Sequence, residues 1–228
     1  MIIGNGLLAN SLRKIDRDDA IFFCSGVSNS GETDPSAFTR ELKLLKGQNP
    51  ELLLCYFSTV SIFNPSKKDS PYILHKCNME AQIRDGFSKH IIVRLPNMMG
   101  EGGNGSNLFP YFLKSIAEDK TVGIFDNTHR ELMEVQLLPD IVNALLKANF
   151  RGSINAGFGQ APKVLDIYLH LCKLLDAAPN MKIEKGEDAY EVDYSEFTTL
   201  MESAGVAPAG DWQDRVERYV KLYRSQFV

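Results

Sequence analysis

Short apolar runs alternate with amphipathic segments through the first 95 residues of the chain. Four runs are apolar almost throughout, as expected for parallel strands that are covered on both faces; they are residues 1–4, 21–24, 52–57 and 90–95. Segments with helical character lie between them, at residues 7–14, from about Pro35 onward, and at 72–86. This order of strands and helices predicts an α/β fold with a doubly wound parallel sheet.

The pattern becomes less regular after Pro96. Residues 100–107 are rich in Gly and Asn and predict a loop. Further on, we expect helices at 108–118, 137–148, 164–175 and 212–223, and short strands at 122–125 and 152–156.

This change of pattern predicts that the chain is divided into two parts. Residues 1–97 are expected to form a dinucleotide-binding core. Residues 98–228 are expected to complete that core at about 134–157 and to form a smaller lobe over the carboxyl ends of the strands, where such folds bind ligands.

Composition excludes several classes of function. The 228 residues are 44% hydrophobic and 24% charged, which is typical of a soluble globular protein, and the net charge of −4 argues against nucleic acid as a partner. The four cysteines lack the spacing of metal ligands, so no metal site is expected. No apolar run reaches the length of a membrane span, and no basic region precedes the first apolar stretch. We expect a cytoplasmic protein with reduced cysteines.

A glycine turn, Gly4-Asn5-Gly6-Leu7-Leu8-Ala9, joins the first strand to the first helix. Gly4 allows a tight turn, and Gly6 lets the backbone approach a pyrophosphate at the N-terminus of the helix. A lone motif of this kind is weak evidence, and an ordinary strand–helix turn is the alternative. Its place after a strand favours a dinucleotide site.

A second motif carries the candidate catalytic chemistry. Ser58 and Thr59 end the third strand, and Tyr72 and Lys76 lie on one face of the next helix. An ammonium near a phenol favours the phenolate, so Lys76 is expected to lower the pKa of Tyr72 and allow it to exchange a proton with a substrate oxygen. Thr59 would hold that oxygen. The alternative is a tyrosine packed beside a surface lysine. With the glycine turn, the set predicts hydride chemistry on a nicotinamide cofactor.

These motifs resemble those of the extended short-chain dehydrogenases/reductases of the NAD-dependent epimerase/dehydratase type. The resemblance covers nearly the whole chain; besides the residues above it includes Glu80, Arg94-Leu95-Pro96-Asn97-Met98-Met99-Gly100, Glu134-Val135, Asp140-Ile141 and Ser153-Ile154-Asn155-Ala156-Gly157. It implies a Rossmann-like fold and a reductase or epimerase that acts on a nucleotide-linked sugar in polysaccharide biosynthesis, with NAD or NADP as cofactor. The sequence does not decide between the two cofactors.

The resemblance also implies the roles of individual residues. Tyr72 is the acid–base, Lys76 its partner and a ribose ligand, and Thr59 orients the substrate. The cofactor would contact Gly4, Asn5, Gly6, Leu7, Leu8, Ser25, Gly26, Ser58, Tyr72, Lys76 and Pro96, and the substrate would contact Thr59, Asn97 and Arg130. A turn-forming role for Asn97 and a surface ion pair for Arg130 are the alternatives. Relatives often form homodimers through the Tyr/Lys helix and the preceding helix, here about 36–46.

The chain departs from the family in its N-terminal half. Only residues 11–20 separate the first helix from the second strand, which is too short for two further strand units. The adenosine side of the site would be open, although Arg13, Lys14 and Arg17 lie nearby. A catalytically inactive binding or scaffold protein on a truncated reductase fold is therefore the alternative function. No aspartate–glutamate pair follows Thr59, so dehydration is the least favoured reaction.

Overall fold

The computed structural model describes residues 1–101, 107–185 and 190–223, so most of the loop expected at 100–107 lies outside the described residues. Its centre is a five-stranded parallel sheet with the strand order β1-β2-β3-β4-β8. The strands are β1 (Ile2–Ile3), β2 (Ala20–Phe23), β3 (Leu53–Thr59), β4 (His90–Leu95) and β8 (Gly152–Asn155). The predicted Rossmann-like parallel sheet is confirmed.

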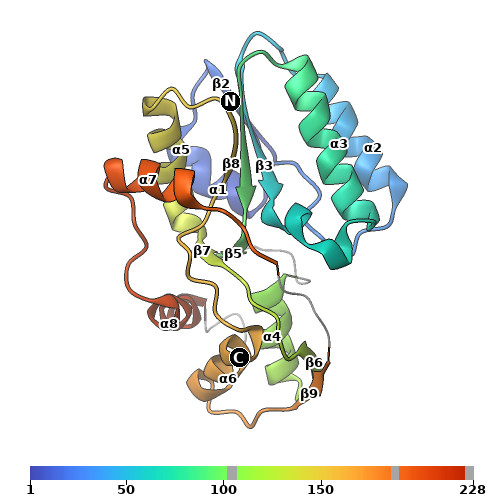
Figure 1. Ribbon diagram of the computed structural model, residues 1–228, viewed down its shortest axis with the longest axis vertical. Helices are drawn as coiled ribbons and strands as arrows, with labels where there is room; N and C mark the ends of the chain where they lie inside the picture. Colours follow the sequence, from blue (N-terminus) through green and yellow to red (C-terminus); the bar gives the residue numbers. More distant parts are fainter. Residues whose placement is uncertain (102–106, 186–189, 224–228) are drawn as a thin grey trace.

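Helices cover both faces of this sheet (Figure 1). One face carries α2 (Pro35–Lys46) and α3 (Pro71–Gly86); the other carries α1 (Leu7–Leu12), α5 (Leu138–Lys147) and α7 (Ser195–Ser203). The strands supply both cores because successive side chains point to opposite faces. Phe22 and Cys55 pack toward α5, whereas Phe23 and Tyr56 pack toward α2 and α3.

Both helices on the α2/α3 face begin with strong local signals. The side chain of Asp34 accepts a hydrogen bond from the backbone of Ser36 before α2, and the Ser70 hydroxyl accepts one from the backbone of Ile73 before α3. Proline occupies the first turn of each helix, where its fixed φ is favourable. The cap at Ser70 fixes the start of the helix that carries Tyr72 and Lys76.

The remaining elements form a smaller cluster below the sheet in Figure 1. A third apolar core joins α4 (Leu108–Ala117), α6 (Val164–Leu174) and α8 (Trp212–Tyr223). Two short parallel pairs accompany them: β5 (Asn97–Met99) with β7 (Leu132–Glu134), and β6 (Val122–Phe125) with β9 (Met181–Glu184). The sequence pattern did not predict β5, β7, β9 or α7.

The link between α1 and β2 is short, as expected. It consists of a 3₁₀ turn, Arg13–Ile15, and residues 16–19. Strand β1 pairs only with β2 and is therefore an edge of the described sheet. The first helix ends at Leu12 instead of continuing to Lys14, and the chain then tightens into the 3₁₀ turn. In the described part of the chain, the helices are too short or too polar to span a bilayer.

Candidate active site

A cavity of about 510 Å³ opens at the carboxyl ends of the sheet strands, which is within the usual size range of ligand pockets. Every site residue expected from the sequence lines it: Gly4, Asn5, Gly6, Leu7, Leu8, Ser25, Gly26, Ser58, Thr59, Tyr72, Lys76, Pro96, Asn97 and Arg130. The fold thus brings the glycine turn, the Tyr/Lys helix and the lobe residues to one place. The individual roles of these residues stay predictions.

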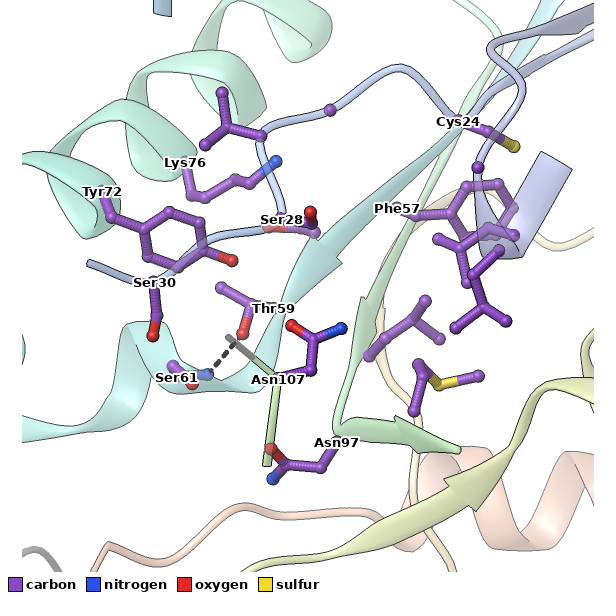
Figure 2. A pocket seen from close by; sticks show the side chains of 18 of the residues that line it. Cys24, Ser28, Ser30, Phe57, Thr59, Ser61, Tyr72, Lys76, Asn97 and Asn107 are labelled. Atoms are coloured by element: carbon purple, nitrogen blue, oxygen red, sulfur yellow. Dashed lines mark hydrogen bonds between the residues drawn. The ribbon is translucent and has the colours of Figure 1, made fainter. Parts of the chain in front are cut away.

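Tyr72 and Thr59 meet at the wall of this cavity. Figure 2 shows the phenol oxygen of Tyr72 directed toward the side chain of Thr59. The hydroxyl of Thr59 also accepts a hydrogen bond of 3.1 Å from the backbone N–H of Ser61, in the 3₁₀ turn Val60–Phe63 that follows β3. The end of β3 and the first turn of α3 thereby hold two hydroxyl groups side by side at the cavity.

Lys76 has partners that the sequence analysis did not anticipate. Its ammonium donates hydrogen bonds to Oε1 of Glu41, at 3.2 Å, and to the hydroxyl of Tyr56, at 3.0 Å. It lies 5.9 Å from the centre of the Tyr72 ring. The side chain is only 3% exposed, so these partners surround it almost completely.

The expected acidification of Tyr72 by Lys76 does not occur in this geometry. Burial raises the pKa of Tyr72 to about 12; the hydrogen bond from Thr59 opposes this, and the negative charge of Glu41 adds to it. Glu41 neutralises the ammonium that was expected to stabilise the phenolate. Tyr72 is therefore a neutral phenol at physiological pH.

Glu41 is the centre of this buried cluster. Burial by itself raises the pKa of its carboxyl group, but hydrogen bonding to His75 and the charge of Lys76 outweigh that effect and lower the pKa to about 2. Phe38, Leu42 and Leu45 surround Glu41 at helical spacing, so its place on the apolar face of α2 was visible in the sequence. That signal was missed.

A second buried carboxylate holds the neighbouring strand ends. Glu80 accepts hydrogen bonds from the Ser58 hydroxyl, at 2.7 Å, and from two nitrogens of Arg94, at 3.0 and 2.7 Å. Burial opposes ionisation, yet the hydrogen bonds from Arg94 and Ser58 lower the pKa of Glu80. Ser58 lines the cavity, but its hydroxyl is committed to Glu80.

Three glycines line the cavity, and a Cβ atom at each would meet different surroundings. Gly4 has φ +123°, and a Cβ there would lie 2.9 Å from the carbonyl carbon and oxygen of Cys24. A Cβ on Gly6 would meet nothing within 4 Å, so the backbone there faces open cavity. A Cβ on Gly26 would lie 2.9 Å from Nζ of Lys76. Gly4 is thus required by the turn, whereas the nearest atoms to a Cβ on Gly26 are the side-chain ends of Lys76 and Glu41.

Residues that follow β4, which we call the lobe residues, form the cavity wall across from Tyr72; they include Asn97, Asn107 and Arg130. The backbone N–H of Asn97 donates to the carbonyl of Glu131, which joins β5 to the segment before β7. The guanidinium of Arg130 lies 5.5 Å from the centre of the Tyr190 ring, and Arg130 lines the cavity. Further polar lining residues were not predicted from the sequence: Ser28, Ser30, Arg40, Ser61, Lys67 and Asn107. Across the described ranges, no group of three or more His, Cys, Asp or Glu side chains is arranged to hold a metal ion.

No family model matches the chain, and no curated protein matches it by sequence. Solved structures do match it. RMD from Pseudomonas aeruginosa, complexed with NADPH, is similar with a TM-score of 0.69 and 17% identity over 98% of this chain and 88% of that one. UDP-N-acetylglucosamine 4-epimerase from Methanobrevibacter ruminantium, in complex with UDP-N-acetylmuramic acid, has a TM-score of 0.68 and 15% identity, covering 98% and 83%.

UDP-glucuronic acid 4-epimerase from Bacillus cereus, in complex with UDP-glucuronic acid and NAD, is also similar. Its TM-score is 0.69 and its identity is 20%, with 96% of this chain and 79% of that chain covered. The chain has the fold of NAD-dependent epimerases and dehydratases. At identities of 20% or less, this likeness establishes the fold and leaves the activity open.

Proposed function

We propose that the protein is an NAD(P)-dependent oxidoreductase or epimerase that acts on a nucleotide-linked sugar, as a step in polysaccharide biosynthesis. Tyr72 exchanges a proton with the reacting oxygen of the sugar, Thr59 holds that oxygen, and Lys76 binds the cofactor ribose. One observation carries the proposal: Thr59, Tyr72 and Lys76 share a single cavity with the Gly4–Gly6 turn.

The cavity fits a nicotinamide cofactor in two respects. The backbone at Gly6 is open to the cavity, so a pyrophosphate can approach it closely. Gly26 allows Lys76 to lie against the loop that follows β2. When bound, the nicotinamide supplies or accepts the hydride. Two of the similar structures, RMD and UDP-glucuronic acid 4-epimerase, were solved with NADPH and with NAD, which supports this choice of cofactor class.

The ionisation of Tyr72 favours one direction of proton transfer. Because burial raises the pKa of Tyr72 to about 12, the residue enters the reaction as a phenol and can donate a proton without prior activation. A phenol that donates while hydride reaches the carbon atom reduces a ketone to an alcohol. The protonation state of Tyr72 therefore suits the reduction of a keto-sugar.

Nucleotide-linked sugars fit the polar wall opposite Tyr72. Asn97, Asn107 and Arg130 face the cavity from the lobe and offer amide and guanidinium donors for sugar hydroxyls and a diphosphate. Two of the similar structures contain UDP-N-acetylmuramic acid and UDP-glucuronic acid. These observations support a nucleotide diphosphate sugar as the substrate class.

Binding and turnover test the proposal together. Purified protein should change the fluorescence of NADH or NADPH in titrations, and a 4-keto nucleotide-sugar should oxidise the bound cofactor in a single turnover. Tyr72→Phe should retain cofactor binding and lower the rate of that oxidation at least about 100-fold, because the proton donor is lost. Full activity of the Tyr72→Phe variant would refute the assignment.

A non-catalytic binding protein is the second candidate. The pairing of Lys76 with Glu41 and the two-residue edge strand β1 favour it, since both differ from what the resemblance implies. Calorimetry separates the two functions. Absence of NADH and NADPH binding at millimolar concentration would support the second candidate, and micromolar binding would exclude it.

A further inference from the structure

Glu41 is a buried carboxylate to which the proposed chemistry assigns no part. It is 0% exposed and has four polar neighbours. Oε1 receives hydrogen bonds from Lys76 and, at 2.7 Å, from the Tyr56 hydroxyl. Oε2 receives one of 2.6 Å from the backbone of Val27 and lies 2.9 Å from Nε2 of His75. A buried charge with this many partners occupies a fixed position.

These contacts also fix Lys76. Two of its three N–H groups are donated to Glu41 and Tyr56, and the third has no hydrogen-bond acceptor among the residues that the structure describes. The ammonium lies so close to the loop after β2 that a Cβ on Gly26 would be 2.9 Å from Nζ and 3.1 Å from Oε1 of Glu41. Gly26 and Lys76 both line the cavity, so the ammonium is held at its wall.

We propose that Glu41 is a positioning residue of the candidate active site, which keeps the Lys76 side chain charged and fixed against Gly26 so that its remaining N–H serves the cofactor. This inference rests on the proposed function in one respect, which is that Lys76 binds the cofactor. The coupling of Glu41 to Lys76 stands on the geometry of the protein alone.

The other groups around Lys76 do not replace Glu41. Burial lowers the pKa of Lys76, and Glu41 is the main influence that raises it again, with a smaller contribution from Glu80. The carboxylate of Glu80 is committed to Ser58, Arg84 and Arg94. Tyr56 and Tyr72 are neutral phenols, and His75 contacts Glu41. Glu41 is therefore the direct counter-ion of Lys76.

Titration of Lys76 in Glu41→Gln tests this inference without any cofactor. Side-chain NMR of ¹³C-labelled lysine would follow Lys76, assigned by its loss in Lys76→Met. We expect the pKa of Lys76 to fall by at least about one unit in Glu41→Gln, because a buried ammonium loses its counter-ion. Glu131→Gln is the matched control, since it replaces a buried carboxylate that bonds the backbone of Phe158 and not Lys76, and should leave the pKa of Lys76 unchanged. Equal titration of Lys76 in the wild type and Glu41→Gln would overturn the proposal.

A stability cycle covers the case in which Glu41→Gln folds poorly. If Glu41 serves Lys76, then Lys76→Met should relieve the damage, because the uncompensated charge disappears. The double variant Glu41→Gln/Lys76→Met should unfold at a higher urea concentration than Glu41→Gln alone. A double variant that is no more stable than Glu41→Gln would show that the two residues act independently and would overturn the proposal.

Cofactor binding separates this inference from the proposed function. In NADH titrations Glu41→Gln should bind at least about tenfold more weakly than the wild type, while Tyr168→Phe, which removes a buried hydroxyl in the lobe, should bind equally well. Wild-type protein that fails to bind NADH would refute the function, whereas the Lys76 titration would still decide the role of Glu41. Equal binding by the wild type and Glu41→Gln would overturn that role.

Discussion

The hydroxyl of Ser58 donates a 2.7 Å hydrogen bond to Glu80, so the strand that carries Thr59 to the cavity is anchored to the helix that carries Tyr72 and Lys76. Glu80 simultaneously binds Arg94 on β4 through two nitrogens, and Arg94 reaches Asn155 on β8 at 3.3 Å. The Glu80 carboxylate therefore connects α3 directly to the ends of β3 and β4, and through Arg94 to the end of β8. The relative position of Thr59 and Tyr72 depends on this connection.

The Glu80→Gln substitution should lower the free energy of unfolding of the protein. Gln retains the shape but leaves the buried side of Arg94 without its anion, and the loss of one partner of a buried pair costs about 3 kcal/mol or more. Urea unfolding would measure this difference. Glu118→Gln removes an exposed partner of Lys120 and should leave the unfolding midpoint unchanged. Equal midpoints for Glu80→Gln and the wild type would contradict the anchoring role.

Alanine substitutions at Gly4 and Gly6 should have different effects: the first should lower stability, and the second should weaken NADH binding. Alanine at Gly4 would adopt a φ near +123° and would place its Cβ 2.9 Å from the backbone of Cys24, so we expect a loss of about 1–3 kcal/mol of stability. Alanine at Gly6 meets no protein atom within 4 Å, and φ there is −83°, so stability should not change. Its methyl group would instead enter the cavity and weaken NADH binding.

Thermal unfolding and NADH fluorescence would be measured on both glycine variants. The expected result is opposite behaviour: Gly4→Ala melts early, and Gly6→Ala melts like the wild type but binds at least about tenfold more weakly. A Gly6→Ala variant with wild-type affinity would show that the turn does not contact the cofactor.

The buried pair of Glu41 and Lys76 should make the protein sensitive to acid. The pKa of Glu41 is about 2 in the fold and near 4.5 in a free side chain, so its contribution is present at neutral pH and is lost as pH falls from about 4.5 to 2. That contribution is on the order of 3 kcal/mol. The free energy of unfolding of Glu41→Gln, measured in urea from pH 6 to 2.5, should depend less on pH than that of the wild type. Parallel pH curves would contradict this assignment.

The parallel sheet, and the meeting of the expected site residues in one cavity, were predictable because they depend on local signals. Buried strands such as 52–57 read as continuous apolar runs, and Pro71 marks the start of the Tyr/Lys helix. In a doubly wound sheet all parallel strands end at the same edge, so residues that follow the strands meet there. Fold class alone therefore predicted that the glycine turn and Thr59 would meet.

The electrostatics of the site could not be predicted in the same way. The partners of Lys76 come from α2 and β3, which are 35 and 20 residues away in sequence, and their convergence depends on tertiary packing. The spacing of Tyr72 and Lys76 predicted that they share a helix face, yet the ammonium pairs with Glu41 and the phenol stays neutral. Strands β5 and β7 were missed because each has only three residues, too few to show a period.

The edge position of β1 predicts that the protein will not distinguish NADH from NADPH. The two cofactors differ only at the adenosine ribose, which complete dinucleotide folds read with a residue beyond the second strand. In the sheet formed by the described residues, β1 pairs only with β2. Two of the three nearby cations have other partners, since Arg17 pairs with Asp19 at 2.6 Å and Arg13 binds Asn10 at 3.3 Å.

We therefore expect the dissociation constants of NADH and NADPH to agree within about threefold, and reduced nicotinamide mononucleotide to bind within about tenfold of NADH, because the proposed contacts lie on the phosphates and the nicotinamide half and none is assigned to the adenosine. Competition titrations against NADH fluorescence would measure all three. The double variant Arg13→Gln/Arg17→Gln is the control and should bind NADPH as the wild type does. A preference for NADPH above about tenfold that disappears in this variant would show that these cations recognise the 2′-phosphate, and the adenosine side of the site would then be closed rather than open.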